Sequence, residues 1–160
     1  MTRDEFKIIF DTYFDEVRNY VYYRSGDKEI ATDIAQDVFT RIWEKRQKLT
    51  TDIKGLLFKI ASDAFISGKR KEQNKLLFNK TFQLDYSVST TEESIFYNEL
   101  KDKYELALTK LPEKQRVVFL MSRIDNLKYN EIAERLKLST KAVEKRMSQA
   151  LNFLRQEIEN

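Results

Sequence analysis

Apolar residues recur every three or four positions through most of the chain, which is the spacing of one buried face of an α-helix. In the N-terminal part this pattern predicts three helices. Thr2 and Glu5 are spaced as a capping box that opens the first helix. Gly26 suits the end of that helix, and Asp27 and Asp52 suit the starts of the next two. The N-terminal part is therefore expected to be a small helical domain.

A second set of helical patterns fills the C-terminal part. Thr90 and Glu93 form another capping box, and an apolar stripe follows them as far as Leu111. Pro112 is well placed in the first turn of a further helix that runs to about Asp125. These signals predict a second domain that is also helical.

Composition supports an all-α fold. The 160 residues include three glycines and one proline, fewer turn-forming residues than sheet-rich folds usually need. Between the two sets of helices the apolar pattern weakens, and the sequence SVSTT ends this stretch. We therefore predict two small helical domains, residues 1–71 and 93–160, joined by a flexible linker at residues 72–92.

Charge alternates along the chain although the formal net charge is only +3. Residues 41–80 carry 11 Lys and Arg against 4 Asp and Glu, and residues 135–160 carry 6 against 3. The other two segments, residues 1–40 and 81–134, are acidic. Basic patches of this kind bind polyanions such as nucleic acid, although solvated helix faces have the same composition.

Cysteine and histidine are absent, which removes disulfides, thiolate chemistry, imidazole bases and nearly every transition-metal site. An enzyme would have to work with carboxylates, lysines and hydroxyls alone. The N-terminal sequence lacks an apolar signal region, and the apolar run at residues 117–121 is too short to cross a bilayer. We expect a soluble cytoplasmic protein with no membrane contact of its own and no metal site.

The stretch DIAQDVFTRIW, residues 33–43, combines two apolar ridges with one polar stripe. On a helix Asp33, Gln36 and Asp37 share a face, which Thr40 continues, while the apolar ridges anchor the helix in a core. The stripe can be a docking surface, a magnesium-binding pair of aspartates or a plain solvated face. Two carboxylates without a third nearby make a poor magnesium site.

The most informative segment is LKYNEIAERLKLSTKAVEKRMSQALNFLR, residues 127–155. It predicts a short helix ending at Leu136, a tight turn and a longer helix from Thr140, and the small Ala133 lets the two helices approach closely. We interpret it as a helix-turn-helix; an ordinary helical hairpin with a charged exterior is the alternative. The polar side chains on the outer face of the second helix form a row that can contact bases and phosphates in the major groove. The candidate contacts are Ser139, Thr140, Lys141, Glu144, Lys145, Arg146, Ser148 and Gln149.

Together these motifs resemble the extracytoplasmic-function (ECF) sigma factors of the sigma-70 family. DIAQDVF followed by a Trp, LLFKIASDAFISGKRK, LPEKQRVVFLMSR and the helix-turn-helix occur in the family's order over nearly the whole chain. The recognition helix is similar in style to those of Bacteroidetes members. The resemblance implies a promoter-specificity subunit that catalyses nothing and needs no cofactor. It also implies three partners: core RNA polymerase, promoter DNA and an anti-sigma factor.

The resemblance also implies a role for each surface. The stripe of Asp33, Gln36, Asp37 and Thr40 would dock on the clamp coiled coil of the largest polymerase subunits, and the helix-turn-helix would bind the -35 duplex. Residues 54–71 match the segment that opens the -10 element and holds one strand. The implied -10 contacts are Lys54, Lys59, Ser62, Asp63, Phe65, Lys69 and Arg70.

Four positions depart from the family pattern or stay ambiguous. Phe65 can stack on a base or belong to the core. Asp63 and Ser67 stand where the family commonly has Asn and Asp, and an ionised Asp63 cannot donate a hydrogen bond, which changes the expected base preference. Lys137 occupies the usual turn glycine, which implies an adjusted turn.

Two other functions remain possible at this stage. A helix-turn-helix regulator that acts without replacing a sigma factor has no need for the DIAQDVF stripe. An adaptor or anti-sigma partner that does not bind DNA has no need for the basic stretch at residues 41–80.

Overall fold

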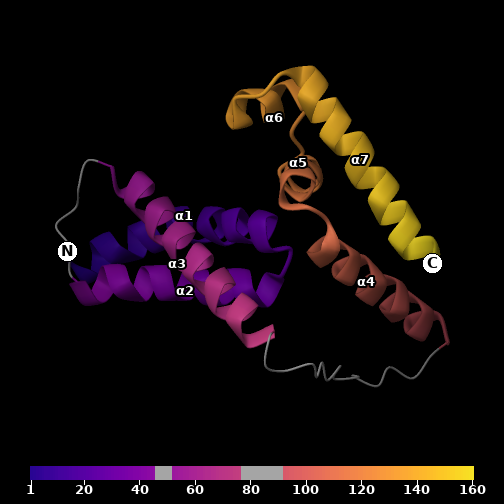
Figure 1. Ribbon diagram of the computed structural model, residues 1–160. Helices are drawn as coiled ribbons and strands as arrows, with labels where there is room; N and C mark the ends of the chain where they lie inside the picture. Colours follow the sequence, from indigo (N-terminus) through magenta and orange to yellow (C-terminus); the bar gives the residue numbers. More distant parts are fainter. Residues whose placement is uncertain (46–51, 77–91) are drawn as a thin grey trace. The chain divides into compact units, whose positions relative to one another are not determined.

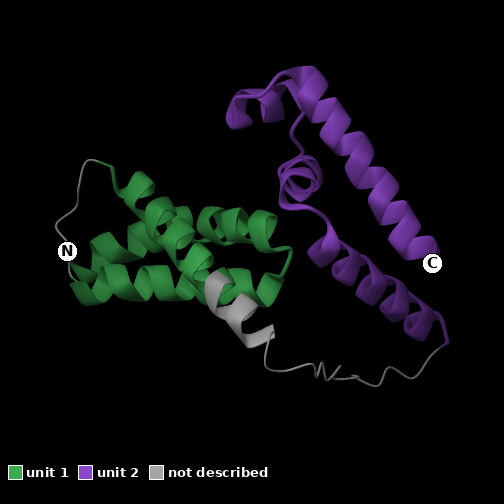
Figure 2. Cartoon of the chain, viewed as in Figure 1, with its two compact units in different colours: residues 1–85 green, residues 86–160 purple. Residues whose placement is uncertain are grey.

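The computed structural model describes residues 1–45, 52–76 and 92–160; in the last turns of the second range, residues 70–76, only the backbone is described. Within these ranges all regular structure is α-helical, as predicted (Figure 1). The chain divides into two compact units, residues 1–85 and residues 86–160 (Figure 2). None of the described helices is long and apolar enough to cross a membrane.

Unit 1 contains the described helices α1 (Arg3–Ser25), α2 (Lys28–Lys45) and α3 (Ile53–Leu76). The predicted capping box is present, because Thr2 Oγ1 accepts from Glu5 N at 3.2 Å and Thr2 N donates to Glu5 Oε2 at 2.7 Å. Gly26 follows α1 with φ of 70°, a conformation that glycine adopts without strain. Asp27 caps α2 by accepting a hydrogen bond from Glu29 N at 2.9 Å. The sequence signals for these helix ends are confirmed.

Asp52 caps α3 as predicted, because its Oδ1 accepts a hydrogen bond from Gly55 N at 2.8 Å. A Cβ on Gly55 would lie 2.2 Å from Asp52 Oδ2, so glycine leaves room for the capping carboxylate. The helix continues to Leu76, and the first part of the predicted linker, residues 72–76, is therefore helical. Most of the remaining linker, including the Thr90 cap, lies outside the described residues.

The core of unit 1 lies between α1, α2 and α3, with α3 crossing the other two helices (Figure 1). Both apolar ridges of residues 33–43 contribute to it: Val38, Phe39 and Ile42 are fully buried. Trp43 stays 36% exposed at the edge, with its ring centroid 5.0 Å from that of Phe6. Burial of the ridges is what fixes which side of α2 faces outward.

Unit 2 contains the helices α4 (Glu92–Lys110), α5 (Glu113–Ile124), α6 (Tyr129–Leu136) and α7 (Thr140–Glu159). Arg116 on α5 is only 5% exposed, and its Nη1 donates to the carbonyls of Leu108 at 3.1 Å and Leu111 at 2.8 Å. These carbonyls lie where α4 ends and lack partners within a helix. The buried guanidinium therefore caps α4 and joins it to α5.

The helix-turn-helix forms as predicted from α6 and α7. Ile132, Ala133, Val143 and Met147 are buried between the two helices and α5. Lys137 occupies the turn in the left-handed conformation with φ of 54°, which costs a non-glycine residue about 1 kcal/mol. The turn therefore accommodates the lysine in the left-handed conformation that glycine usually supplies.

Candidate functional surfaces

The polar stripe of α2 is exposed along its whole length. Asp33, Gln36, Asp37 and Thr40 all face outward, because the opposite side of α2 is buried against α1 and α3. Among the described residues, no ion pair or side-chain hydrogen bond involves the side chains of Asp33, Gln36 or Asp37. Thr40 donates its hydroxyl proton to the Gln36 carbonyl at 2.9 Å, within the same helix. The stripe thus displays two carboxylates and an amide that have no partner within the described part of the chain.

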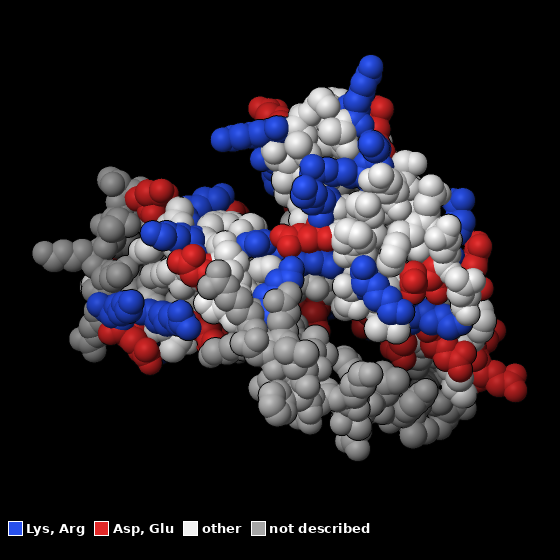
Figure 3. All heavy atoms as spheres, in the orientation of Figure 1, with Lys and Arg blue, Asp and Glu red and all other residues white. Residues whose placement is uncertain are grey.

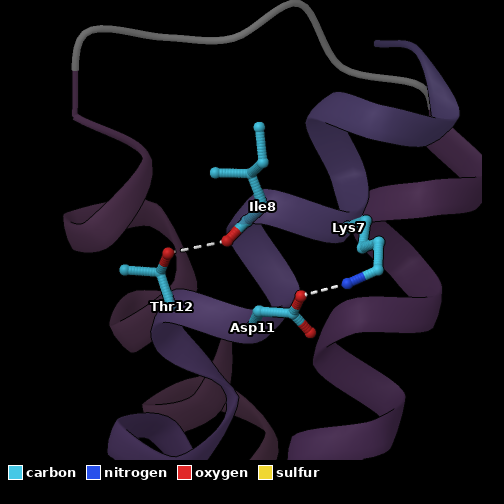
Figure 4. A network of polar contacts seen from close by, with 4 residues as sticks. All are labelled: Lys7, Ile8, Asp11 and Thr12. Atoms are coloured by element: carbon cyan, nitrogen blue, oxygen red, sulfur yellow. Dashed lines mark hydrogen bonds and ion pairs between the residues drawn. The ribbon is translucent and has the colours of Figure 1, made fainter.

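The outer face of α1 behaves differently, although it is also polar and exposed. Lys7 and Asp11 form an ion pair one turn apart, and the Thr12 hydroxyl donates to the Ile8 carbonyl at 2.7 Å (Figure 4). The hydrogen bond and the charge of Asp11 raise the pKa of Lys7 above its ordinary value. Charges on this face compensate each other. The described residues provide no such compensation for the stripe on α2, which is therefore the better candidate for binding a charged partner.

The magnesium alternative gains no support from the geometry. No group of three or more acidic residues that could hold a metal ion is found in the part of the chain that the structure describes. Among the residues that the structure describes, Asp33 and Asp37 therefore have no third acidic side chain placed to complete such a site.

On α3, the side chain of Lys54 is engaged within unit 1. Its Nζ lies 2.8 Å from Glu16 Oε2 on α1, and 5.9 Å from the ring centroids of both Tyr13 and Phe58. About half of each charged side chain is still exposed. Lys54 can reach a phosphate only by leaving or sharing this carboxylate.

Two other predicted -10 contacts of α3 also face α1. Ser62 accepts a hydrogen bond from Arg24 Nη1 at 3.0 Å. Phe65 is only 6% exposed, and the Arg24 guanidinium lies 4.7 Å from its ring centroid. The structure thus places Phe65 in the core, the second of the two roles that the sequence left open, and leaves almost no ring surface for stacking on a base.

The remaining predicted -10 contacts are exposed. Lys59, Asp63 and Lys69 face outward along α3, as does Ser67, and the side chain of Arg70 lies outside the described residues. Asp63 also lines a small pocket of about 120 Å³ between α2 and α3. Its other lining residues are Arg41, Ile42, Lys45 and Ile60.

The pocket adds two cations that the sequence reading missed. Arg41 and Lys45 come from the last turns of α2, and both are exposed. Their signal in the sequence was the switch from acidic to basic composition near residue 41. Only the tertiary structure shows that these cations face the same pocket as Asp63 on α3.

In unit 2 most of the predicted row of α7 points outward, including Lys141, Glu144 and Lys145. Cationic side chains project from the end of the unit where α6 and the start of α7 lie (Figure 3). Ser139 accepts a hydrogen bond from Ala142 N at 3.1 Å and caps the helix. Of the other predicted contacts, Thr140, Ser148 and Gln149 are exposed and Arg146 is half-buried.

Gln149 is exposed but has a partner in its own unit. Its Oε1 accepts a hydrogen bond from Gln115 Nε2 on α5 at 3.3 Å. This contact orients the amide on the surface of the helix, and a base would have to share it or replace it.

Two family models match the chain, one in each unit. Sigma-70 region 2 matches residues 9–75, and Sigma-70, region 4 matches residues 101–154. This chain belongs to the sigma-70 family. The first match contains the α2 stripe and all of α3 except its last residue, and the second contains the helix-turn-helix as far as Leu154.

Similar proteins narrow the class. The ECF RNA polymerase sigma factor SigW of Bacillus subtilis is 27% identical over 174 residues, which cover 98% of this chain and 90% of SigW. The RNA polymerase sigma factor YlaC of the same organism is 26% identical over 138 residues, covering 82% of this chain and 79% of YlaC. With regions 2 and 4 both present, the chain is a sigma factor of the ECF class that functions in transcription initiation.

A solved structure shares the fold. The sigma factor RpoE from Bartonella quintana, solved in complex with the anti-sigma factor NepR, has a TM-score of 0.55 to this chain. The two are 19% identical, and the match covers 97% of each chain.

Proposed function

We propose that unit 1 docks on core RNA polymerase through the α2 stripe and holds the opened -10 strand along α3, while unit 2 places α7 in the major groove of the -35 duplex. The observation that carries this assignment is the α2 stripe, whose two carboxylates and amide are exposed and lack partners among the described residues. A surface of this kind steers and orients a basic partner, and its rigid backing fixes the register of docking.

On α3 the exposed groups suit a single strand that has left the duplex. Lys59 and Lys69, with Arg41 and Lys45 across the pocket, supply charge for the backbone phosphates. Asp63 supplies an acceptor, and an ionised carboxylate accepts hydrogen bonds but donates none. We infer that Asp63 favours a base with an exocyclic amine, which cytosine, adenine and guanine carry, over thymine, which has none, at the position it faces.

On α7 the proposed contacts divide into two kinds. Gln149 and Glu144 present groups that can pair with base edges, adenine and cytosine respectively, whereas Lys141 and Lys145 can meet phosphate or guanine. Ser139 caps the start of the helix, and Thr140 beside it is exposed and can donate a hydrogen bond to a DNA phosphate.

The resemblance supports further proposals about partners and origin. We infer that the chain catalyses no reaction, needs no cofactor and works in the cytoplasm, and that its origin is Bacteroidetes-like. An anti-sigma factor is proposed as a regulatory partner, as NepR is for the matched RpoE. Such a partner would have to cover surfaces that bind polymerase, of which the α2 stripe is the clearest.

One experiment tests the assignment directly. The purified chain is added to sigma-free core polymerase and a genomic promoter library, and initiated transcripts are sequenced. Discrete start sites are expected, whereas the chain alone should bind duplex DNA weakly because its two basic surfaces lie on separate units and core polymerase has to fix their separation. Tight specific binding without polymerase, and no initiation with it, would contradict the proposal and indicate a conventional regulator.

A further inference from the structure

Arg24, near the C-terminal end of α1, connects that helix to α3 and belongs to none of the surfaces assigned above. Its Nη1 donates hydrogen bonds to Ser62 Oγ at 3.0 Å and to Tyr20 Oη at 3.1 Å. The guanidinium lies 4.7 Å from the ring centroid of Phe65 and 5.7 Å from that of Tyr20. One half-buried cation thus holds two positions of α3 that are nearly one helical turn apart.

The part of α3 held by Arg24 also carries proposed -10 contacts. Asp63 lies between Ser62 and Phe65 in the sequence, and Lys69 Nζ is 5.5 Å from the centroid of the same Phe65 ring. A rotation of α3 about its axis would therefore move Asp63 and Lys69 together. The orientation of both depends on how firmly Ser62 and Phe65 are held against α1.

Arginine is suited to this task in a way that lysine is not. Its planar guanidinium offers several N–H donors in a fixed arrangement and stacks on aromatic rings at the same time. A charged donor also makes a stronger hydrogen bond to a hydroxyl than a neutral donor does. A lysine ammonium at position 24 could keep the charge near Phe65. It has no planar group, so it could not stack on the Phe65 ring and donate a directed hydrogen bond to Ser62 at the same time.

We propose that Arg24 is a positioning residue that fixes α3 against α1, and that capture of the opened -10 strand depends on it. Arg24 acts through Ser62 and Phe65 and does not itself touch DNA. The inference rests on the proposed assignment of α3 to the -10 strand and adds a specific requirement to it: the exposed groups of α3 work only in the register that α1 imposes.

Four variants test this role in the holoenzyme, and a matched control is available on the same helix. Arg24→Gln removes the charge and the planar guanidinium, Arg24→Lys keeps the charge alone, and Ser62→Ala removes the hydroxyl that accepts the hydrogen bond from Arg24. Arg18→Gln is the control, because Arg18 pairs with Asp15 at 3.1 Å and lies over Phe14, and both of these partners are on α1. The fourth variant combines Arg24→Gln with Ser62→Ala.

Each variant is bound at saturation to core polymerase, and open-complex formation is measured on the strongest promoter that the wild-type library experiment identifies. A second template carries the same promoter with a mismatched, already open -10 element. We expect Arg24→Gln to lower open-complex formation about ten-fold on both templates, Ser62→Ala about three-fold and Arg24→Lys to an intermediate extent. Arg18→Gln should stay within two-fold of wild type, and the double variant should be no worse than Arg24→Gln.

Two further measurements, the affinity for core polymerase and the binding of the -35 duplex by the holoenzyme, distinguish a positioning role of Arg24 from a general loss of stability. Both should be unchanged in Arg24→Gln, because they depend on α2 and α7. A parallel fall in core binding and strand capture would overturn the inference, as would normal open complexes in Arg24→Gln. If that variant fails to fold, Ser62→Ala decides, since normal initiation by Ser62→Ala would overturn the inference. Failure of the wild-type chain to initiate at all would contradict the proposed function instead.

Discussion

The α2 and α3 surfaces of unit 1 lie side by side on one small domain, yet they differ in whether their polar side chains have partners within that domain. On α2 the side chains of Asp33, Gln36 and Asp37 are exposed and have no partner among the described residues. On α3 Lys54 is paired with Glu16 and Ser62 is bound by Arg24. The first surface is open to a partner as it stands, whereas part of the second is held by its own domain.

This difference indicates two modes of binding. In the proposed assignment, docking on α2 displaces water from carboxylates that have no partner among the described residues, so the surface can guide the first encounter with a basic partner. In the same assignment, a strand that binds along α3 has to replace contacts that Lys54 and Ser62 make within unit 1. Each new contact there therefore contributes less free energy of binding than a contact on α2. Such an arrangement favours polymerase binding before strand capture.

The largest expected effect comes from removing the α2 stripe. Replacing Gln36 and Asp37 by Ala should weaken binding to core polymerase at least about 100-fold, because these side chains have no partner among the described residues and are proposed to contact the polymerase directly. The free energy of unfolding should change by less than about 0.5 kcal/mol, as is usual for exposed positions. Binding is measured by fluorescence titration with labelled core polymerase, and unfolding by circular dichroism.

The outer face of α1 provides the matched control. Lys7→Ala combined with Asp11→Ala removes an equally exposed but self-compensating pair (Figure 4), and core binding should not change. Unfolding of the Gln36 and Asp37 variant would instead mean that the stripe is structural. Normal core binding by that variant would show that the polymerase contact lies elsewhere.

The next largest effect concerns Phe65. Because its ring is 6% exposed, Phe65→Ala should destabilise unit 1 by about 3 kcal/mol through the cavity it leaves. Asp63→Asn, at an exposed position beside it, should change stability by less than about 0.5 kcal/mol. Denaturant unfolding measures both. Unchanged stability in Phe65→Ala, together with lost strand binding, would return Phe65 to the DNA-contacting set.

A moderate effect is expected on α7, where one group is held and its neighbour is free to contact DNA. Gln149→Ala should change base preference in the -35 element by about 1 to 3 kcal/mol, whereas Lys145→Ala should act uniformly and reduce the salt dependence by about one unit of slope. Gln115→Ala is the control, since it frees the Gln149 amide and should retain its base preference. Transcription from a panel of promoter variants at several salt concentrations measures these effects. Unchanged preference in Gln149→Ala and Lys145→Ala would move recognition to another face.

The smallest effect tests whether α3 really exchanges internal contacts for external ones. Glu16→Gln should leave stability within about 0.5 kcal/mol, because exposed ion pairs contribute little. It should strengthen binding of a -10 single strand to the holoenzyme and make that binding more salt-dependent, because Lys54 becomes free for a phosphate. Asp15→Asn, which breaks the ion pair with Arg18 on the same helix, should do neither. Equal strand affinities in both variants would remove Lys54 from the DNA-contacting set.

Helix ends and helix faces followed from local signals. Thr2, Gly26, Asp27 and Asp52 each act within a few residues of their own position, so their spacing was enough to predict the helix boundaries that they control. The outward direction of the α2 stripe followed equally from the buried ridges on the opposite side. These features depend on helical periodicity alone, which a sequence displays directly.

Contacts between helices were not accessible in the same way. The resemblance implied that Lys54 and Ser62 contact the -10 element, and nothing in the local pattern indicates that Glu16 and Arg24 lie opposite them on α1. The shared pocket of Asp63 with Arg41 and Lys45 was missed for the same reason. Periodicity determined the all-α class, the two helical units, the outward side of α2 and most of the outward row of α7. Only tertiary packing decided which of those outward groups keep their charge free for a partner, because that depends on the distance to side chains remote in the sequence.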